Sequence, residues 1–351
     1  MLILKKSLNL LGKWLDPYKM KIEENYSIKE YNSLRTNQFS KYFCSIDAVE
    51  QLYEAIEFSK TKGIPCLFIG EGSNIVFTDD FEGLLIKNNI FGKTEHDNKT
   101  VEIFSGENWH KFVKWSLSKE RYGLENLALI PGTVGASPIQ NIGAYGKEVS
   151  SFIKEVKSIN ILTAQEKIFS KDDCKFGYRS SLFQNNKEFF ITSVVFETNP
   201  DPHIDISYDS LQTFFKASPK KITNLTPQEV FEGVSSLRRR VLPDHKKEFN
   251  AGSFFKNLIL EKSDFRNLNK IINVPYHETN LKYKVPSGFL IEKAGWKGKR
   301  LKNVKVSQKH ALVLIANGNQ DGKEIIKFAQ SIIDDVYEKF KVKLEIEPTL
   351  I

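Results

Sequence analysis

Residues 129–146 read LIPGTVGASPIQNIGAYG, a strip of eighteen residues with four glycines, two prolines and no charged side chain. The chain as a whole is 27% charged, so a strip of this length without charge is unusual in it. The glycines permit positive φ angles and let the backbone approach a ligand closely. Anion binding would then fall to backbone N–H groups and to Thr133, Ser137, Gln140 and Asn141. A loop of this length without secondary structure of its own is usually functional, and a long Ω-loop without a ligand is the alternative.

A second glycine turn, GEGSN at 70–74, follows the apolar run Cys66–Ile69. The apolar run predicts a buried strand, and the β-branched and apolar residues of 75–86 predict more strand after the turn. A Rossmann fingerprint requires a helix after its glycine turn, so that interpretation is excluded. A glycine turn between strands can form a nest of N–H groups that accepts an anion, although a simple hairpin is favoured for the turn alone. Together with the strip, it predicts two phosphate-binding loops and an uncharged surface for a large, flat cofactor.

Composition predicts a globular protein of more than one domain. The chain has 351 residues and is 40% hydrophobic, which favours two or three domains. Its net charge of +8 is spread along the chain, and the densest basic clusters, at 237–241 and 245–247, are short. Such clusters suit a solvated surface or a pocket for a small anion at least as well as a nucleic-acid groove. We therefore expect no nucleic-acid partner.

Cysteine spacing and hydropathy indicate the compartment. Cys44, Cys66 and Cys174 are far apart and fit no metal-binding spacing, so no metal site is expected. No stretch approaches the roughly 20 apolar residues that a membrane span needs. Residues 1–19 lack the apolar core and cleavage site of a signal peptide. We expect a cytoplasmic protein without a membrane partner, preceded by an N-terminal extension of unknown role.

Hydrophobic periodicity predicts an α+β protein of several interleaved domains. A helix is expected from a cap at Ser45 to Gly63, and a second from Trp109 up to Gly123. Strands are expected within 151–200, a polar stretch from there to about 245, and glycine- and aromatic-rich loops over 250–298. A final helix carries apolar residues at helical spacing from Ile325 to Phe340, and 341–351 alternates like a strand.

Five motifs in one order resemble the UDP-N-acetylenolpyruvoylglucosamine reductase family. They are GEGSN (70–74), ENLALIPGTVGASPIQNIGAYG (125–146), FGYRSSLF (176–183), NAGSFFKN (250–257) and LEIEP (344–348). The resemblance runs from about residue 21 to the end of the chain. It implies a vanillyl-alcohol-oxidase-like (PCMH-type) FAD-binding fold of two subdomains, followed by a C-terminal α+β substrate-binding domain.

The resemblance also implies a division of the chain. The expected parts are an N-terminal extension (1–20), a first FAD-binding subdomain (21–88, completed by 344–351), a second (89–242) with a substrate loop near 207–211, and a substrate-binding domain (243–343).

The activity that the resemblance implies belongs to peptidoglycan precursor synthesis. NADPH reduces bound FAD, and the reduced flavin passes hydride to the enolpyruvyl ether of UDP-N-acetylglucosamine, giving UDP-N-acetylmuramate. The expected partners are the UDP-sugar and NADPH, and a monomer is expected.

Three residues match the catalytic positions of the family. Arg179 would grip the substrate carboxylate, because a guanidinium binds a carboxylate through two parallel hydrogen bonds. Ser253 would donate the proton to the carbanion. Glu347 would act as a protonated acid beside the substrate, which requires burial to raise its pKa. Glu345 stays open as an alternative, because residues two apart on a strand share a face.

Cofactor and substrate residues follow from the same motifs. The resemblance assigns FAD binding to Gly70, Glu71, Gly72, Ser73, Asn74, Pro131, Gly132, Thr133, Gly135, Ala136, Ser137 and Gly143. Substrate contacts are expected from Tyr208, which matches the tyrosine-bearing loop of one type within the family, and from Asn257 and Lys293.

Two of the departures from the family pattern bear on phosphate and substrate contacts. Val241 stands where a lysine is usual, which puts a phosphate or nicotinamide contact in doubt, and Lys293 stands where glutamine is commoner. Arg238 to Arg240 and Lys256 are further candidates for the phosphates of the UDP-sugar or NADPH.

Two other functions stay open from the sequence. Another flavoenzyme of the same fold, such as an oxidase of a small alcohol, would share the cofactor loops, since a fold does not fix a function. A non-catalytic basic binding protein would carry no flavin and would bind nucleic acid with a steep salt dependence.

Overall fold

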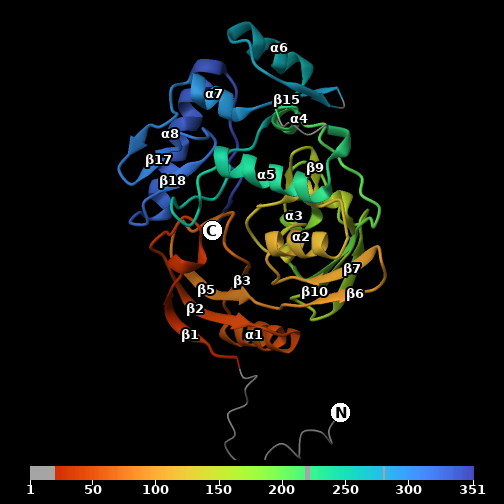
Figure 1. Cartoon of the computed structure of the whole chain (residues 1–351). Coiled ribbons are helices and arrows are strands. Elements are labelled where there is room, and N and C mark those ends of the chain that lie inside the picture. The colour runs from red at the N-terminus through yellow and green to blue at the C-terminus, as the bar shows by residue number, and fades with distance from the viewer. Residues whose placement is uncertain (1–19, 218–221, 280) are drawn as a thin grey trace, which may run out of the picture.

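The computed structural model describes residues 20–217, 222–279 and 281–351 (Figure 1). The predicted extension, 1–20, lies outside the described residues except for Met20.

The first lobe is a four-stranded sheet in the order β1 (Glu23–Ser27), β2 (Phe39–Ile46), β5 (Phe81–Asn88) and β3 (Cys66–Ile69). β2, β5 and β3 run parallel, and β1 is antiparallel to β2. α1 (Val49–Lys62) covers this sheet by burying Leu52, Ala55 and Ile56 against strand residues such as Ile46 and Leu84.

The predicted start of the first helix was wrong, and its end is confirmed. Ser45 does not cap α1, because it lies in β2, where Ser45 pairs with Lys87 and Ile46 with Asn88. The buried Ile46 fits the period of a strand as well as that of a helix, and the sheet partner decides between them. Gly63 ends α1 in the left-handed conformation, with a φ of 63°.

The second lobe contains a five-stranded antiparallel sheet. Its order is β11 (Glu166–Ser170), β10 (Ile153–Asn160), β12 (Phe189–Glu197), β7 (Thr100–Phe104) and β6 (Lys93–Glu95). α2 (Trp109–Ser118) packs against it, with Trp109 and Phe112 fully buried beside Phe196. Asn108 caps α2 by accepting a hydrogen bond from the Lys111 N–H. α3 (Leu182–Asn185) precedes β12.

Two helices occupy the stretch that the sequence interpretation left as polar. They are α4 (Asp209–Lys216) and α5 (Pro227–Val241), and α5 crosses the middle of the molecule in Figure 1. Thr226 and Glu229 form a capping box at the start of α5, with Pro227 in its first turn. This TPQE signal was readable in the sequence and was missed.

The third lobe holds two small antiparallel sheets and three helices. The sheets are β13 (Leu258–Leu260), β15 (Lys282–Val285) and β14 (His277–Thr279), and β16 (Arg300–Leu301), β17 (Val304–Val306) and β18 (Leu314–Ala316). The helices are α6 (Lys262–Ile271), α7 (Ser287–Lys293) and α8 (Gly322–Phe340). The expectation of loops over 250–298 was therefore wrong: β13, β14 and β15 span only three or four residues each, too few for a clear period, and the ten-residue α6 was missed.

The C-terminal residues return to the first lobe. β19 (Thr349–Leu350) pairs in parallel with β4 (Ile75–Val76), directly after the GEGSN turn. Only 349–350 forms a strand, so the expected alternation over 341–351 was wrong in extent. Residues 345–347 instead bond to 254–256 of the third lobe, which ties that lobe to the glycine turn.

The uncharged strip has little regular structure. It contains η3 (Val134–Ala136) and β8 (Gly143–Ala144), which pairs with β9 (Lys147–Glu148). The remaining 3-10 turns are η1 (Lys29–Tyr31), η2 (Glu125–Leu127), η4 (Val149–Ser151) and η5 (Ile222–Asn224). Backbone bonds from Val134 to Glu107 and from Gly135 to Ser105 hold the strip against the loop between β7 and α2.

Candidate active site

The GEGSN turn presents a run of free backbone donors. The N–H groups of Gly70 to Asn74 have no hydrogen-bond acceptor among the residues that the structure describes. Gly72 has a φ of 61°, and a Cβ there would meet the Tyr31 carbonyl oxygen, so only glycine fits. Successive N–H groups around a left-handed residue form a nest that suits a phosphate.

The strip lies directly against this turn. A Cβ on Gly70 would stand 2.5 Å from the Thr133 Oγ1, and one on Gly132 would stand 3.2 Å from the Ser73 Oγ. The Glu71 carboxylate joins the two loops, because it accepts from the Asn108 Nδ2 at 2.5 Å and from the Gly132 N–H at 2.9 Å. The donor groups and the close approach of the two backbones fit the diphosphate of a dinucleotide.

Not every residue assigned to the cofactor presents its side chain to a ligand. Ser137 donates its hydroxyl hydrogen to the Val134 carbonyl at 2.7 Å, and a Cβ on Gly135 would stand 2.5 Å from Ser105 Cβ. Glu71 is a cross-link between loops. These three therefore shape the strip. Asn74 and Gln140 join their side chains at 2.8 Å, and the Gln140 Nε2 donates to the Glu347 carbonyl at 3.1 Å.

Arg179 lies at the tip of a tight turn and points at the C-terminal segment. Gly177 and Ser180 exchange backbone hydrogen bonds across the turn, and Arg179 takes a φ of 50°. A left-handed φ in a residue with a Cβ persists only where surrounding contacts fix it. The Arg179 Nε donates to the Glu347 Oε1 at 2.9 Å, and its Nη2 donates to the Gly143 carbonyl at 3.1 Å. Nη1 has no acceptor in the described part of the chain, so one edge of the guanidinium is left for a ligand.

Glu347, rather than Glu345, faces Arg179. The Glu347 side chain is 14% exposed, whereas that of Glu345 is 72% exposed and pairs with the Lys256 Nζ at 3.4 Å. The two do not share a face, because 345–347 is not regular strand. Burial raises the pKa of Glu347 above its ordinary value, and Arg179, Lys256 and Lys284 oppose that rise.

Ser253 directly precedes Phe254, whose segment is hydrogen-bonded to the backbone of Glu347. The Phe254 carbonyl accepts from the Glu347 N–H at 3.0 Å, and Phe254 and Phe255 are fully buried. Ser253 bridges to Val313 on the other side. The Ser253 hydroxyl makes no hydrogen bond to any described residue, so its proton is free to be donated to a ligand. The position of the residue is fixed by its backbone contacts.

A second group of aromatic and basic residues lies next to the strip. Tyr208 directly precedes α4 and is 42% exposed, and its ring contacts that of Tyr145 in the strip edge to face, with 5.6 Å between ring centres. Arg238, from the last turn of α5, lies close enough to oppose the rise that burial causes in the pKa of Tyr145. The Arg238 Nε is buried without a hydrogen-bond partner, which is costly unless a ligand satisfies it.

Comparisons with known proteins agree with this geometry. Residues 244–351 match the family described as the C-terminal domain of UDP-N-acetylenolpyruvoylglucosamine reductase, and residues 41–170 match the FAD binding domain. The UDP-N-acetylenolpyruvoylglucosamine reductase of Flavobacterium johnsoniae is 38% identical over 341 residues, covering 95% of this chain and 100% of the relative. That of Paraburkholderia phytofirmans is 38% identical over 331 residues, covering 92% and 96%.

This chain belongs to the UDP-N-acetylenolpyruvoylglucosamine reductase family. The fold agrees as well. The solved reductase of Thermus caldophilus superimposes with a TM-score of 0.67 at 19% identity, covering 95% of this chain and 99% of that one. The predicted fold class, two FAD-binding subdomains with a C-terminal substrate domain, is confirmed.

The reductase site contains residues that the sequence interpretation did not assign. Tyr178 lies under the Lys284 Nζ, which is 4.2 Å from the centre of its ring. Burial lowers the pKa of Lys284, and Arg179 adds to that lowering. Neither residue had a signal in the sequence beyond its place in or near a motif, because the contact joins segments about a hundred residues apart.

The substrate candidates of the reductase lie at different places. Asn257 is near the Tyr178 hydroxyl and accepts from the Ser287 N–H at 3.1 Å, and the centre of the Tyr178 ring is 5.6 Å from the Arg179 Cζ. Lys293 is exposed at the end of α7, 5.5 Å from the ring of Phe289. No contact in the described residues joins Lys293 to Arg179, Glu347 or Ser253. Val241 is 40% exposed at the end of α5.

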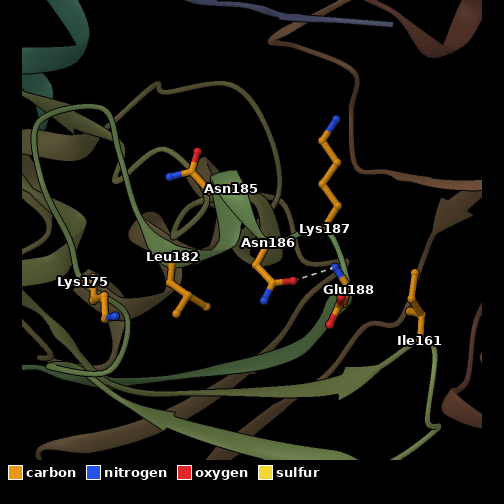
Figure 2. A pocket seen from close by; sticks show the side chains of 7 residues that line it. All are labelled: Ile161, Lys175, Leu182, Asn185, Asn186, Lys187 and Glu188. Atoms are coloured by element: carbon orange, nitrogen blue, oxygen red, sulfur yellow. Dashed lines mark hydrogen bonds between the residues drawn. The ribbon is translucent and has the colours of Figure 1, made fainter.

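A hollow of about 600 Å³ lies apart from these residues (Figure 2). It is lined by Ile161, Lys175, Leu182, Asn185, Asn186, Lys187 and Glu188. Figure 2 shows the Asn186 side chain accepting from the Glu188 N–H, at 3.1 Å. None of the residues predicted for the reductase site lines it.

The described residues offer neither a metal-binding cluster nor a reactive thiolate at Cys44 or Cys174. They contain no cluster of three His, Cys, Asp or Glu side chains that could hold a metal ion. Burial raises the pKa of Cys44 and of Cys174 to about 12, so both stay as thiols. No described helix is long and apolar enough to cross a membrane.

Proposed function

We propose that this chain reduces UDP-N-acetylenolpyruvoylglucosamine to UDP-N-acetylmuramate with NADPH as the electron donor and FAD as the bound cofactor. One observation carries the proposal. The Arg179–Glu347 pair and the Ser253 segment meet beside the strip and the GEGSN turn, in a chain that matches the curated reductases over nearly its whole length. An oxidase of a small alcohol would not need this pair and is not favoured.

The GEGSN turn and the strip would hold FAD. The free N–H groups of Gly70 to Asn74 suit its diphosphate, and the uncharged strip through Gly143 suits its flat ring system. When bound, FAD supplies the two-electron chemistry that carries reducing equivalents from NADPH to the enolpyruvyl double bond. The protein's share is to position the substrate and to manage charge and a proton.

Arg179 would bind the carboxylate of the enolpyruvyl group. Its Nε and Nη2 are already used by Glu347 and Gly143, which fixes the plane of the guanidinium and presents Nη1 to the substrate. As the double bond is reduced, negative charge grows on the carbon next to the carboxylate and spreads into it. A fixed cation stabilises that charge without reorganising. Protonated Glu347 would donate to the same carboxylate.

Ser253 would supply the proton that completes the reduction. A serine hydroxyl is a weak acid, so it donates only to a strongly basic centre such as this carbon. Ser253 is partly buried and is followed by the fully buried Phe254 and Phe255, which fix the backbone that carries the hydroxyl.

Tyr208 and Arg238 would contact the UDP portion. Tyr208 lies on the exposed side of Tyr145, and the buried Arg238 Nε lacks a partner that a diphosphate oxygen would provide. This arrangement supports assignment to the type with a tyrosine-bearing loop. Arg238 would then supply part of the positive charge that the family's usual lysine, replaced here by Val241, would bring to a phosphate.

We propose the same division of the chain that the resemblance implies. Residues 21–88 with 344–351 and residues 89–242 would enclose FAD, and 243–343 would close on the substrate. Pairing of β19 with β4 and bonding of 345–347 to 254–256 support this division. We further propose a cytoplasmic monomer that serves peptidoglycan synthesis and, through it, cell shape and division.

The test is product formation by the purified holoprotein. NADPH oxidation should depend on UDP-N-acetylenolpyruvoylglucosamine, and mass spectrometry should show a product heavier than the substrate by two hydrogens. NADPH oxidation that proceeds at the same rate without the sugar, with no reduced product, would reject the activity.

A further inference from the structure

Lys87 is a partly buried lysine that the proposed reaction does not use. It lies on β5 beside the buried Ile86 and Asn88, and it pairs with Ile69 at the end of β3. Its Nζ donates to the Gly70 carbonyl at 2.7 Å. No carboxylate within the described ranges forms an ion pair with Lys87. The two carboxylate oxygens of Glu71 instead accept hydrogen bonds from Asn108 and Gly132. A partly desolvated ammonium without a salt bridge is costly, so its presence calls for a reason.

The bond to Gly70 fixes the direction of the first donor in the nest. The C=O and N–H of one trans peptide unit point in opposite directions. Because the Gly70 carbonyl points to Lys87, the Glu71 N–H of the same peptide unit points away from it. That N–H belongs to the run of free donors from Gly70 to Asn74.

We propose that Lys87 is a cofactor-positioning residue, which orients the GEGSN donors and places one positive charge behind them for the diphosphate of FAD. The inference rests on the proposed function only in taking FAD as the ligand. Lys87 touches the loop and not the reacting atoms, so its effect belongs to cofactor affinity.

The electrostatics of the site agree with this role. Burial lowers the pKa of Lys87, and the nearby Glu71 opposes that lowering. A bound diphosphate would add two negative charges near the ammonium and would favour its charged form further. In the free protein the ammonium is therefore partly desolvated, with Glu71 nearby but no salt bridge to it, and a bound diphosphate would add negative charge beside it.

The test compares FAD affinity and stability in three variants of the full chain. Lys87→Met removes the charge and the donor at similar length, Lys87→Arg keeps both, and Lys41→Met is the control. Lys41 lies on the neighbouring β2 and pairs with Glu82 at the surface, at 3.6 Å. Each protein is freed of flavin, its thermal unfolding is recorded, and FAD is titrated by fluorescence.

Lys87→Met is expected to weaken FAD binding about tenfold or more, since a charge-assisted hydrogen bond is lost. Its flavin-free form should unfold within about 2 °C of wild type, because the lost hydrogen bond to the Gly70 carbonyl is offset by removal of a partly desolvated charge. Lys87→Arg should stay within about threefold of wild-type affinity, and Lys41→Met should not change it.

Unchanged FAD affinity in Lys87→Met would overturn the proposal. So would equal weakening in Lys87→Arg, because charge and donor would then not be the cause. A clearly lower unfolding temperature of flavin-free Lys87→Met would assign Lys87 to the fold instead. If wild type itself fails to bind FAD, the proposed function falls rather than the role of Lys87 within it.

Discussion

The contact between Arg179 and Glu347 joins positions 168 residues apart. No spacing rule could have predicted it, whereas the motif around each residue could be recognised separately. The choice between Glu345 and Glu347 needed the structure for the same reason. Alternation assumes a regular strand, and the hydrogen bonds of 345–347 to 254–256 replace one here. The side chains therefore diverge, one to solvent and one to Arg179.

Replacing Arg179 by lysine should separate charge from geometry. Lysine keeps the positive charge but cannot donate to Glu347, Gly143 and a substrate carboxylate in one plane. We expect kcat/KM for the enolpyruvyl sugar to fall about 100-fold or more. The rate of flavin reduction by NADPH should change little. Arg266→Lys, on the exposed side of α6, is the matched control. If Arg179→Lys slowed only the reduction of flavin by NADPH and left the reaction with the enolpyruvyl sugar unchanged, the role given to Arg179 would be contradicted.

Glu347 gives a prediction in the pH profile. Burial raises its pKa, and the form that donates to the substrate is the protonated one. Activity should therefore fall as pH rises through the raised pKa of Glu347. Glu347→Gln cannot ionise, so its kcat should be lower by about 10² and should lack that descending limb. Measurement of kcat from pH 5 to 9 in both proteins decides this. An identical descending limb in both would show that another group titrates.

At the scale of elements, the sequence predicted helices and strands correctly where their local signal was strong. It failed where contacts with another segment decide between helix and strand. The run Cys66–Ile69 was long and apolar enough to identify β3, and Trp109 marked the start of α2. Ser45 and Ile46 suited a helix or a strand, and pairing with β5 chose the strand. The strands of 250–298 span three or four residues each, so their periods are too short to read, and the ten-residue α6 buries only Phe265 and Leu268, so its apolar stripe is short. The strip, by contrast, was identified because its lack of charge is a property of composition.

α5 allows a test of an element that was missed. The Thr226 hydroxyl and the Glu229 carboxylate form a capping box at its start. Thr226→Ala should lower the free energy of unfolding by about 1 kcal/mol, with flavin content unchanged. Chemical denaturation followed by circular dichroism measures this. Thr163→Ala, at an exposed turn residue, is the control and should have no effect. Equal stability of both variants would mean that packing alone holds the start of α5.

At the scale of the whole molecule, the site depends on the return of the chain end to its beginning. β19 pairs with β4 beside the glycine turn, and the residues just before it bond to the Ser253 segment. The last eight residues therefore connect the predicted cofactor loops to the third lobe (Figure 1). Sequence could suggest this only through the resemblance to the reductase family, since short strands at a chain end carry almost no signal.

The central claim is that electrons pass from NADPH through a bound flavin to one specific sugar. The most direct measurement is the visible spectrum of the purified holoprotein without oxygen, first with NADPH and then with UDP-N-acetylenolpyruvoylglucosamine. The account predicts that the yellow flavin bleaches with NADPH and returns only when the enolpyruvyl sugar is added. A flavin that bleaches but ignores the sugar would contradict the substrate, and a protein that neither contains nor binds FAD would contradict the account as a whole.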